Sequence, residues 1–182
     1  MHLDFNDNSS QVRLIKKARE FPVYECLISE GWQENGFPRI VLSRKQTDNR
    51  LIVGAFLVDT YCLGIKNAFC KADISIEEYE NLKLRMFQMA PAVTCYPRLA
   101  NRIIYGAVEY ARKLRFEPHE DCLLSSFVLE EPSHEDLSFD VEFGKDGKPL
   151  YIAGPDDNVD DIMEKLTNRL GEENFHYIIA SD

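Results

Sequence analysis

The segment Phe56–Asn67 places an acid, a thiol and an amine within eight residues, at the end of an apolar run. Asp59, Cys62 and Lys66 are the three chemically active side chains. Burial and mutual charge would shift the pKa of both ionisable groups, as catalytic sites require. A nearby cation would also favour the thiolate form of Cys62, which is the nucleophilic form.

A cysteine nucleophile needs a base and a group that orients the base. His119 is the best candidate of the four histidines, because it lies in a polar loop between two predicted elements. Asp59 or Asp121 would orient its ring, and Lys66 would stabilise an anion. The segment therefore predicts a cysteine-dependent hydrolase.

The same residues also fit a purely structural role. In that alternative Asp59 pairs with Lys66 and caps the following turn, and Cys62 is inert packing.

Two further hypotheses come from charge. Arg98 and Arg102 lie four residues apart on one predicted helix face and could bind a phosphate. Asp59, Glu109 and Asp121 would then be the metal ligands of a nucleic-acid-processing enzyme. The other hypothesis is a non-catalytic binding or regulatory module, in which the acidic C-terminal third contacts a partner.

The net charge is −10, which argues against broad, non-specific binding to nucleic acid. This charge is unevenly distributed, because residues 1–116 carry +4 and residues 117–182 carry −14. One interpretation is a solvated acidic surface. The other is a bipolar molecule whose mildly basic face meets an anionic ligand.

Composition and motifs limit the remaining classes. No apolar run approaches the length that spans a membrane, and the first residues do not resemble a signal peptide. The five cysteines lack zinc-type or redox-type spacing, and no phosphate-binding glycine loop is present. We therefore expect a cytoplasmic protein without a metal or cofactor, whose partner is a small molecule or a protein.

The pattern of predicted helices and strands indicates one α+β domain over residues 1–182, which would position these side chains. A subdivision near residues 130–137 is left open. A mostly antiparallel sheet would carry about four helices. The predicted helices are 9–20, with Ser9 or Ser10 as cap, 76–89, 97–115 and 159–170. The predicted strands are 23–29, 39–44, 51–59, 122–129, 139–143, 150–153 and 175–180, with 139–153 forming a hairpin.

Three sequence blocks resemble an uncharacterised family of bacterial proteins. The first is Val53–Asn67, which contains Phe-Leu-Val-Asp-Thr-Tyr-Cys-Leu-Gly-Ile-Lys. The second is Arg102–Ala111 with Phe116–His119, and the third is Phe143–Pro155. Some members resemble proteins joined to a SEC-C metal-binding motif, but this chain lacks that Cys/His cluster. Asn101 also stands where relatives tend to show histidine. The resemblance implies a bacterial cytoplasmic protein and draws attention to Asp59, Cys62, Lys66 and His119, without implying a reaction.

Overall fold

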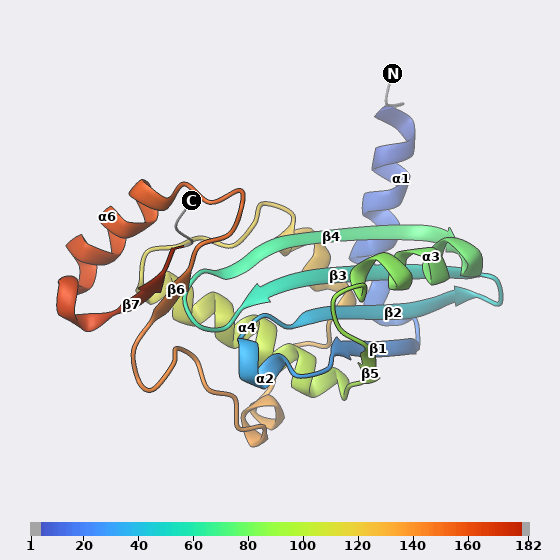
Figure 1. The fold of residues 1–182 in the computed structure, drawn as a ribbon. Helices are drawn as coiled ribbons and strands as arrows, with labels where there is room; N and C mark the ends of the chain where they lie inside the picture. The colour runs from blue at the N-terminus through green and yellow to red at the C-terminus, as the bar shows by residue number, and fades with distance from the viewer. Residues whose placement is uncertain (1–4, 180–182) are drawn as a thin grey trace.

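The protein is α+β, built on a five-stranded antiparallel sheet in the order β4-β3-β2-β1-β5 (Figure 1). The structure is a computed structural model that describes residues 5–179. The strands of this sheet are β1 (Val23–Ser29), β2 (Arg39–Thr47), β3 (Arg50–Asp59), β4 (Gly64–Ser75) and β5 (Ala92–Thr94). The first four strands follow one another as a meander, so each pairs with its neighbour in sequence.

The helices divide between the two faces of this sheet. They are α1 (Phe5–Lys16), α2 (Trp32–Asn35), α3 (Ile76–Met86), α4 (Pro97–Lys113), α5 (Cys122–Ser125) and α6 (Val159–Leu170). Helix α3 lies across one face, and α1 and α4 lie on the other (Figure 1). In the described part of the chain, no helix has the length and apolar character needed to cross a bilayer.

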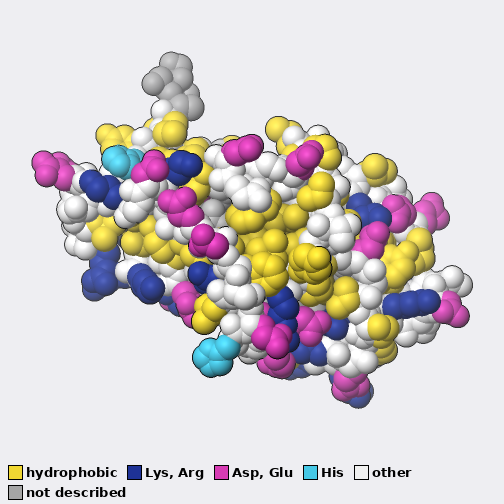
Figure 2. Space-filling view, turned by 90° about the horizontal axis from the view of Figure 1, so that it is seen from below, with side chains coloured by type: hydrophobic (Ala, Val, Ile, Leu, Met, Phe, Trp, Pro, Cys, Tyr) yellow, Lys and Arg dark blue, Asp and Glu magenta, His cyan; other side chains and the backbone are white. Residues whose placement is uncertain are grey.

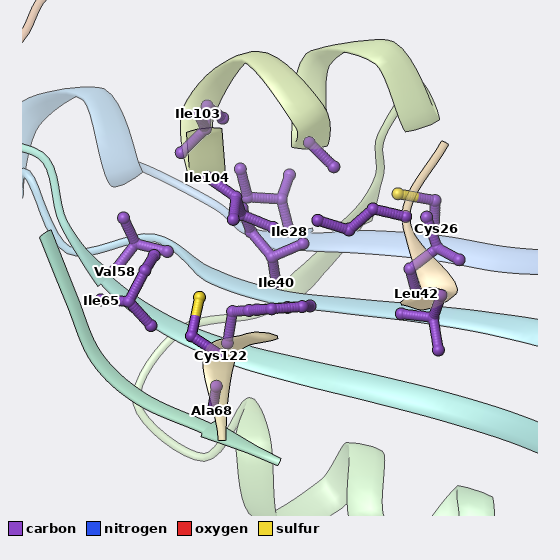
Figure 3. Close-up of a cluster of buried hydrophobic side chains, with 14 of the residues drawn as sticks. Cys26, Ile28, Ile40, Leu42, Val58, Ile65, Ala68, Ile103, Ile104 and Cys122 are labelled. Carbon is purple, nitrogen blue, oxygen red and sulfur yellow. The ribbon is translucent and has the colours of Figure 1, made fainter. Parts of the chain in front are cut away.

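The core has two layers because the sheet is covered on both faces. Ile40, Leu42 and Val58 belong to the layer on the side of α4, together with Ile103 and Ile104 of that helix (Figure 3). The opposite layer lies beneath α3, and its central residues are Val41, Val53, Ala55, Tyr79 and Leu82. Strand β3 contributes to both layers, which explains why its sequence is almost continuously apolar.

A smaller parallel sheet follows near the C-terminal end. Strand β6 (Leu150–Ile152) pairs with β7 (His176–Ile178), and α6 provides the crossover that a parallel pair requires. Tyr151 and Leu166 are completely buried in this unit, and their cluster includes Cys62 at the end of the main sheet.

The acidic segment between the two sheets is held by arginines. Arg44 is 3% exposed and donates to the carbonyl oxygens of Val128 and Phe21 at 2.7 and 2.8 Å. Its third hydrogen bond, at 2.8 Å, reaches the Glu130 carboxylate. The subdivision left open near residues 130–137 therefore falls at a segment that Arg44 holds to the rest of the fold.

Several elements agree with the sequence predictions. Strand β1 and helix α6 have the predicted bounds, and β2 and β3 form the predicted hairpin. Ser75 caps α3 with the predicted reciprocal hydrogen bonds to Glu78. Helix α1 begins at Phe5 rather than Ser9, so the serines predicted as caps lie inside it.

The strand predicted over 122–129 is wrong. These residues form α5 and a 3-10 turn at Ser126–Val128. The run is apolar, but the helical turns bury Cys122 and Ser125 while Leu123 is 77% exposed. That three-residue spacing of buried positions is helical.

The hairpin predicted over 139–153 is also wrong. A single bridge joins Lys145 to Lys148 at the Asp-Gly turn, and β6 takes its partner from β7 instead. Strand β4 was missed, because it is an edge strand in which lysine, asparagine and aspartate interrupt the apolar positions. Helix α2 lies in a segment predicted as loop, where it amounts to one turn.

We expect Arg44→Met to lower the free energy of unfolding by about 3 kcal/mol, because it leaves two carbonyl groups and a carboxylate without their donor. Urea denaturation followed by circular dichroism measures this change. Arg13→Met, at an exposed position on α1, is the matched control. Equal effects from the two variants would contradict the anchoring role of Arg44.

Candidate functional site

The candidate site is the turn between β3 and β4, and a single carboxylate organises it. Asp59 is completely buried and accepts hydrogen bonds from the backbone N–H groups of Tyr61, Cys62 and Leu63. These distances are 2.8, 3.0 and 3.0 Å. The capping role considered for Asp59 in the structural alternative is therefore present in the fold.

Burial and hydrogen bonding act on Asp59 in opposite directions. Removal from water raises the pKa of its carboxyl group to about 6, and the three N–H donors and Lys66 offset only part of that effect. Every hydrogen bond that the structure gives to this carboxylate comes from the backbone of its own turn. Asp59 is thus positioned to hold the backbone rather than to contact a ligand.

Cys62 points into the apolar cluster that joins the two sheets. Its side chain has no exposure, and its neighbours there include Leu63, Ala111 and Tyr151. Burial, followed by the negative charge of Asp59, raises the pKa of the Cys62 thiol, and the charge of Lys66 offsets only part of this rise. Both effects favour the protonated thiol, which is the less reactive form.

Lys66 pairs with a residue that the sequence did not single out. Its Nζ lies 3.0 Å from Asp157, in the loop before α6. The Asp157 carboxylate also accepts from the N–H of Gly154 at 2.8 Å and from the Tyr151 hydroxyl at 3.3 Å. Burial alone would raise the pKa of Asp157, but these donors hold it below its ordinary value.

The backbone of His119 lies next to the start of β4. Its N–H donates to the carbonyl of Ile65 at 3.0 Å. Its ring Nδ1 accepts from the N–H of Asp121 at 3.2 Å, so the two residues form a local turn. Among the described residues, no hydrogen bond joins His119 to Cys62. The predicted catalytic roles of these residues stay predictions.

The two predicted ligand-binding arginines contact different parts of the protein. Arg98 lies 3.3 Å from the Asp136 carboxylate and donates to the carbonyl of Glu131 at 2.8 Å. The Arg102 guanidinium lies over the Phe143 ring, 5.0 Å from its centroid. Both arginines hold the segment that follows α5, and neither lines the turn at Asp59.

The predicted metal ligands do not form a site in the described chain. Asp59 is occupied by its turn, Glu109 is exposed on α4, and Asp121 is exposed beside His119. Within residues 5–179, no group of three or more His, Cys, Asp or Glu side chains is arranged to hold a metal ion.

Sequence reasoning missed three residues that lie around Cys62 and Lys66 in the fold, namely Tyr110, Tyr151 and Asp157. Burial, followed by nearby acidic groups, raises the pKa of Tyr151 to about 12, and burial raises that of Tyr110 to about 12. Asp157 stands in a turn rich in Asp and Asn, a pattern that indicates helix capping. No spacing rule connects it to Lys66, which lies 91 residues away.

No protein-family model, curated protein or solved structure matches the chain. The resemblance of the three sequence blocks to a bacterial family therefore stays a prediction.

We expect Asp59→Asn to change how stability depends on pH. Because the folded-state pKa is about 6 and the ordinary value is 3.8, the folded state binds more protons between these values. The free energy of unfolding of the wild type should then fall by about 3 kcal/mol, relative to the variant, as pH rises through this window.

Urea denaturation from pH 4 to pH 7 measures this difference. Asp156→Asn is the matched control, because Asp156 is exposed in the loop before α6. A constant difference between wild type and Asp59→Asn across the window would show that the buried carboxyl group does not titrate there.

Cys62 should resist alkylation in the folded protein. Its burial and raised pKa disfavour the thiolate, so iodoacetamide should label it only as fast as the protein unfolds. Mass mapping of labelled peptides from pH 7 to pH 9 measures the rate. Rapid labelling below pH 7.5 would indicate an activated thiol and would restore the hydrolase hypothesis.

Proposed function

We propose that this protein is a non-catalytic binding module, and that it binds an acidic segment of a partner protein that also carries apolar side chains. The binding surface is the α3 groove, which we define as the hollow between α3 and β4, lined by Phe69, Lys71, Ile74, Glu78, Asn81, Leu82, Leu84 and Arg85. Its volume is about 720 Å³. The observation that carries the proposal is a pair of cations without ion-pair partners beside an apolar floor.

The floor of the α3 groove is apolar because α3 covers only part of its face of the sheet. Ile74 and Leu82 are buried there, and Phe69 is partly buried. Phe69 also lines a second hollow of 150 Å³, which continues over β3 toward Leu57 and Met86. Leu84 stands on the rim with 72% of its surface exposed. Apolar pockets with an exposed apolar rim are typical of surfaces that bind peptide side chains.

The charges around the α3 groove favour an acidic ligand. Lys71 and Arg85 are exposed, and no ion pair among the described residues includes either one. The one acid in the lining, Glu78, accepts the N–H of Ser75 in the helix cap, and this hydrogen bond and the charge of Lys71 lower its pKa, so it stays negative. Arg39, in the adjoining hollow, is also without an ion-pair partner in the described chain. The two cations of the lining exceed its one acid, so the surplus charge is positive.

The other flank of α3 lacks this imbalance. A hollow of 390 Å³ lies there, and it shares Leu84 with the α3 groove. Its cation, Lys83, lies 3.0 Å from Glu25 and 2.9 Å from Glu80. The charges on this flank are satisfied internally, so the flank beside β4 is the better site for an acidic ligand.

Exposed apolar side chains continue from α3 to the start of α4. Leu84, Met89, Val93 and Tyr96 are each at least 40% exposed. Seen from the β1–β5 edge of the sheet, apolar side chains gather across the middle of the molecule, with charged side chains around them (Figure 2). This extent of apolar surface suits a protein segment better than a small molecule.

The geometry of the candidate site supports a binding module over a hydrolase. The thiol that would act as nucleophile has no solvent exposure, and its raised pKa keeps it protonated. The lysine that would stabilise an anion is already paired with Asp157.

Selection from a random peptide library displayed on phage tests the proposal. We expect the enriched peptides to combine Asp or Glu with Leu, Ile or Phe. Their affinity should fall at least about tenfold in Lys71→Glu/Arg85→Glu and in Leu84→Ser, as fluorescence polarisation would measure with a labelled enriched peptide.

Two matched variants separate the groove from general effects of charge and surface. Lys113→Glu/Arg115→Glu makes the same charge change at the end of α4, and Leu123→Ser removes an apolar side chain with 77% exposure on α5. Both should bind the peptides normally. Enrichment of basic peptides, or binding that only the control variants weaken, would overturn the proposal.

A further inference from the structure

Cys26 and Cys95 lie opposite each other on neighbouring strands. In the antiparallel pairing of β1 with β5, Leu27 is opposite Thr94 and Ile28 is opposite Val93. One step further along this register places Cys26 opposite Cys95. The N–H of Cys95 donates to the carbonyl of Cys26 at 2.8 Å, which shows that the register continues to this pair.

This arrangement brings the two thiols close enough to react with each other. Opposite residues in an antiparallel pair have Cα atoms about 4.5 to 5.5 Å apart, within the range that disulfides span. Both side chains belong to the same buried cluster, with exposures of 4% and 6%, and both cysteines are free. The Cys26 side chain is visible in Figure 3 among the apolar residues facing α4.

We propose that Cys26 and Cys95 form a reversible redox site, which takes a small-molecule disulfide as oxidant and becomes a disulfide between β1 and β5. This site is independent of the α3 groove and of Cys62. Nothing in the spacing of the two cysteines, which are 69 residues apart, indicates it in the sequence.

The two thiols differ in a way that assigns their order of reaction. The Cys95 thiol donates to the carbonyl oxygen of Tyr96 at 3.3 Å. The neighbouring Cys26 side chain, and the N–H of Ala100 in the first turn of α4, lower the pKa of the Cys95 thiol. The neighbouring Cys95 side chain, followed by burial, raises the pKa of the Cys26 thiol. Cys95 is thus the thiol that more readily becomes a thiolate, and Cys26 is the resolving thiol.

The reaction has two exchange steps. The Cys95 thiolate attacks one sulfur of the oxidant, forms a mixed disulfide and releases the first small thiolate, which takes up the proton that Cys95 lost. Cys26 then loses its proton and attacks the Cys95 sulfur, which releases the second small thiolate to receive that proton. Two cysteine thiols are oxidised to one disulfide, and one small disulfide is reduced to two thiols.

Access to the buried pair requires β5 to separate locally from β1. Strand β5 has three residues, all exposed, and it lies at the edge of the sheet. Short edge strands are among the segments that open most readily. The Cβ atoms of opposite residues are also slightly further apart than those of a relaxed disulfide, so the bond should be easily reduced.

Oxidation of the reduced wild-type protein with oxidised glutathione tests the proposal. After the oxidised protein is denatured and its remaining thiols are alkylated with N-ethylmaleimide, we expect three labelled cysteines where the reduced protein has five. Digestion with trypsin should yield peptide 20–39 joined to peptide 86–98, and dithiothreitol should separate them. Amide hydrogen exchange at residues 92–95 should become slower in the oxidised protein.

The single variants distinguish a redox pair from two packed thiols. Cys26→Ser should stop at a mixed disulfide of glutathione with Cys95, whereas Cys95→Ser should react at neither position. Cys122→Ser, at another buried cysteine, should form the same cross-link as the wild type. Five free thiols after prolonged oxidation of the folded protein would overturn the proposal, as would a cross-link that forms only in denaturant.

Discussion

A buried carboxylate at the end of β3 determines where the two parts of the fold meet. Asp59 closes the turn that leads into β4 by accepting three backbone N–H groups. The carbonyl groups inside that turn then point outward, where Thr60 accepts from the N–H of Gly144 and Tyr61 accepts from the N–H of Leu150. The C-terminal unit, which contains β6, α6 and β7, is therefore attached to carbonyl groups that are in place only while the turn is closed.

The same turn must also lie close to α4. Gly64 adopts a φ of +76°, and a Cβ atom there would lie 2.7 Å from the Cβ of Ala111. A residue with a side chain would meet both the strained backbone conformation and the steric contact. Glycine thus allows the turn to pack against the helix, with Cys62 enclosed on the inner side.

The uneven charge of the chain has a partly internal explanation. The excess of basic residues in residues 1–116 includes Arg19, Arg44 and Arg98. These three arginines bind the acidic segment near residues 126–136. These cations serve the packing of the two parts of the chain against each other and do not form a basic face. Lys71 and Arg85, two of the cations without an ion pair in the described chain, lie on the other face of the sheet beside α3.

The sequence by itself determined the fold class, the β2–β3 hairpin, the cap of α3 and the extent of α6, because periodicity, turn residues and caps act over a few residues. It also identified Asp59, Cys62 and Lys66 as unusual for a strand end. Only the tertiary structure decided what these residues do, since that depends on burial and on partners far along the chain. Lys66 meets Asp157 through the docking of the C-terminal unit, and Cys26 meets Cys95 through the placement of β5 beside β1. Neither contact leaves a local pattern, because strand order and packing bring together residues whose spacing in the sequence carries no signal.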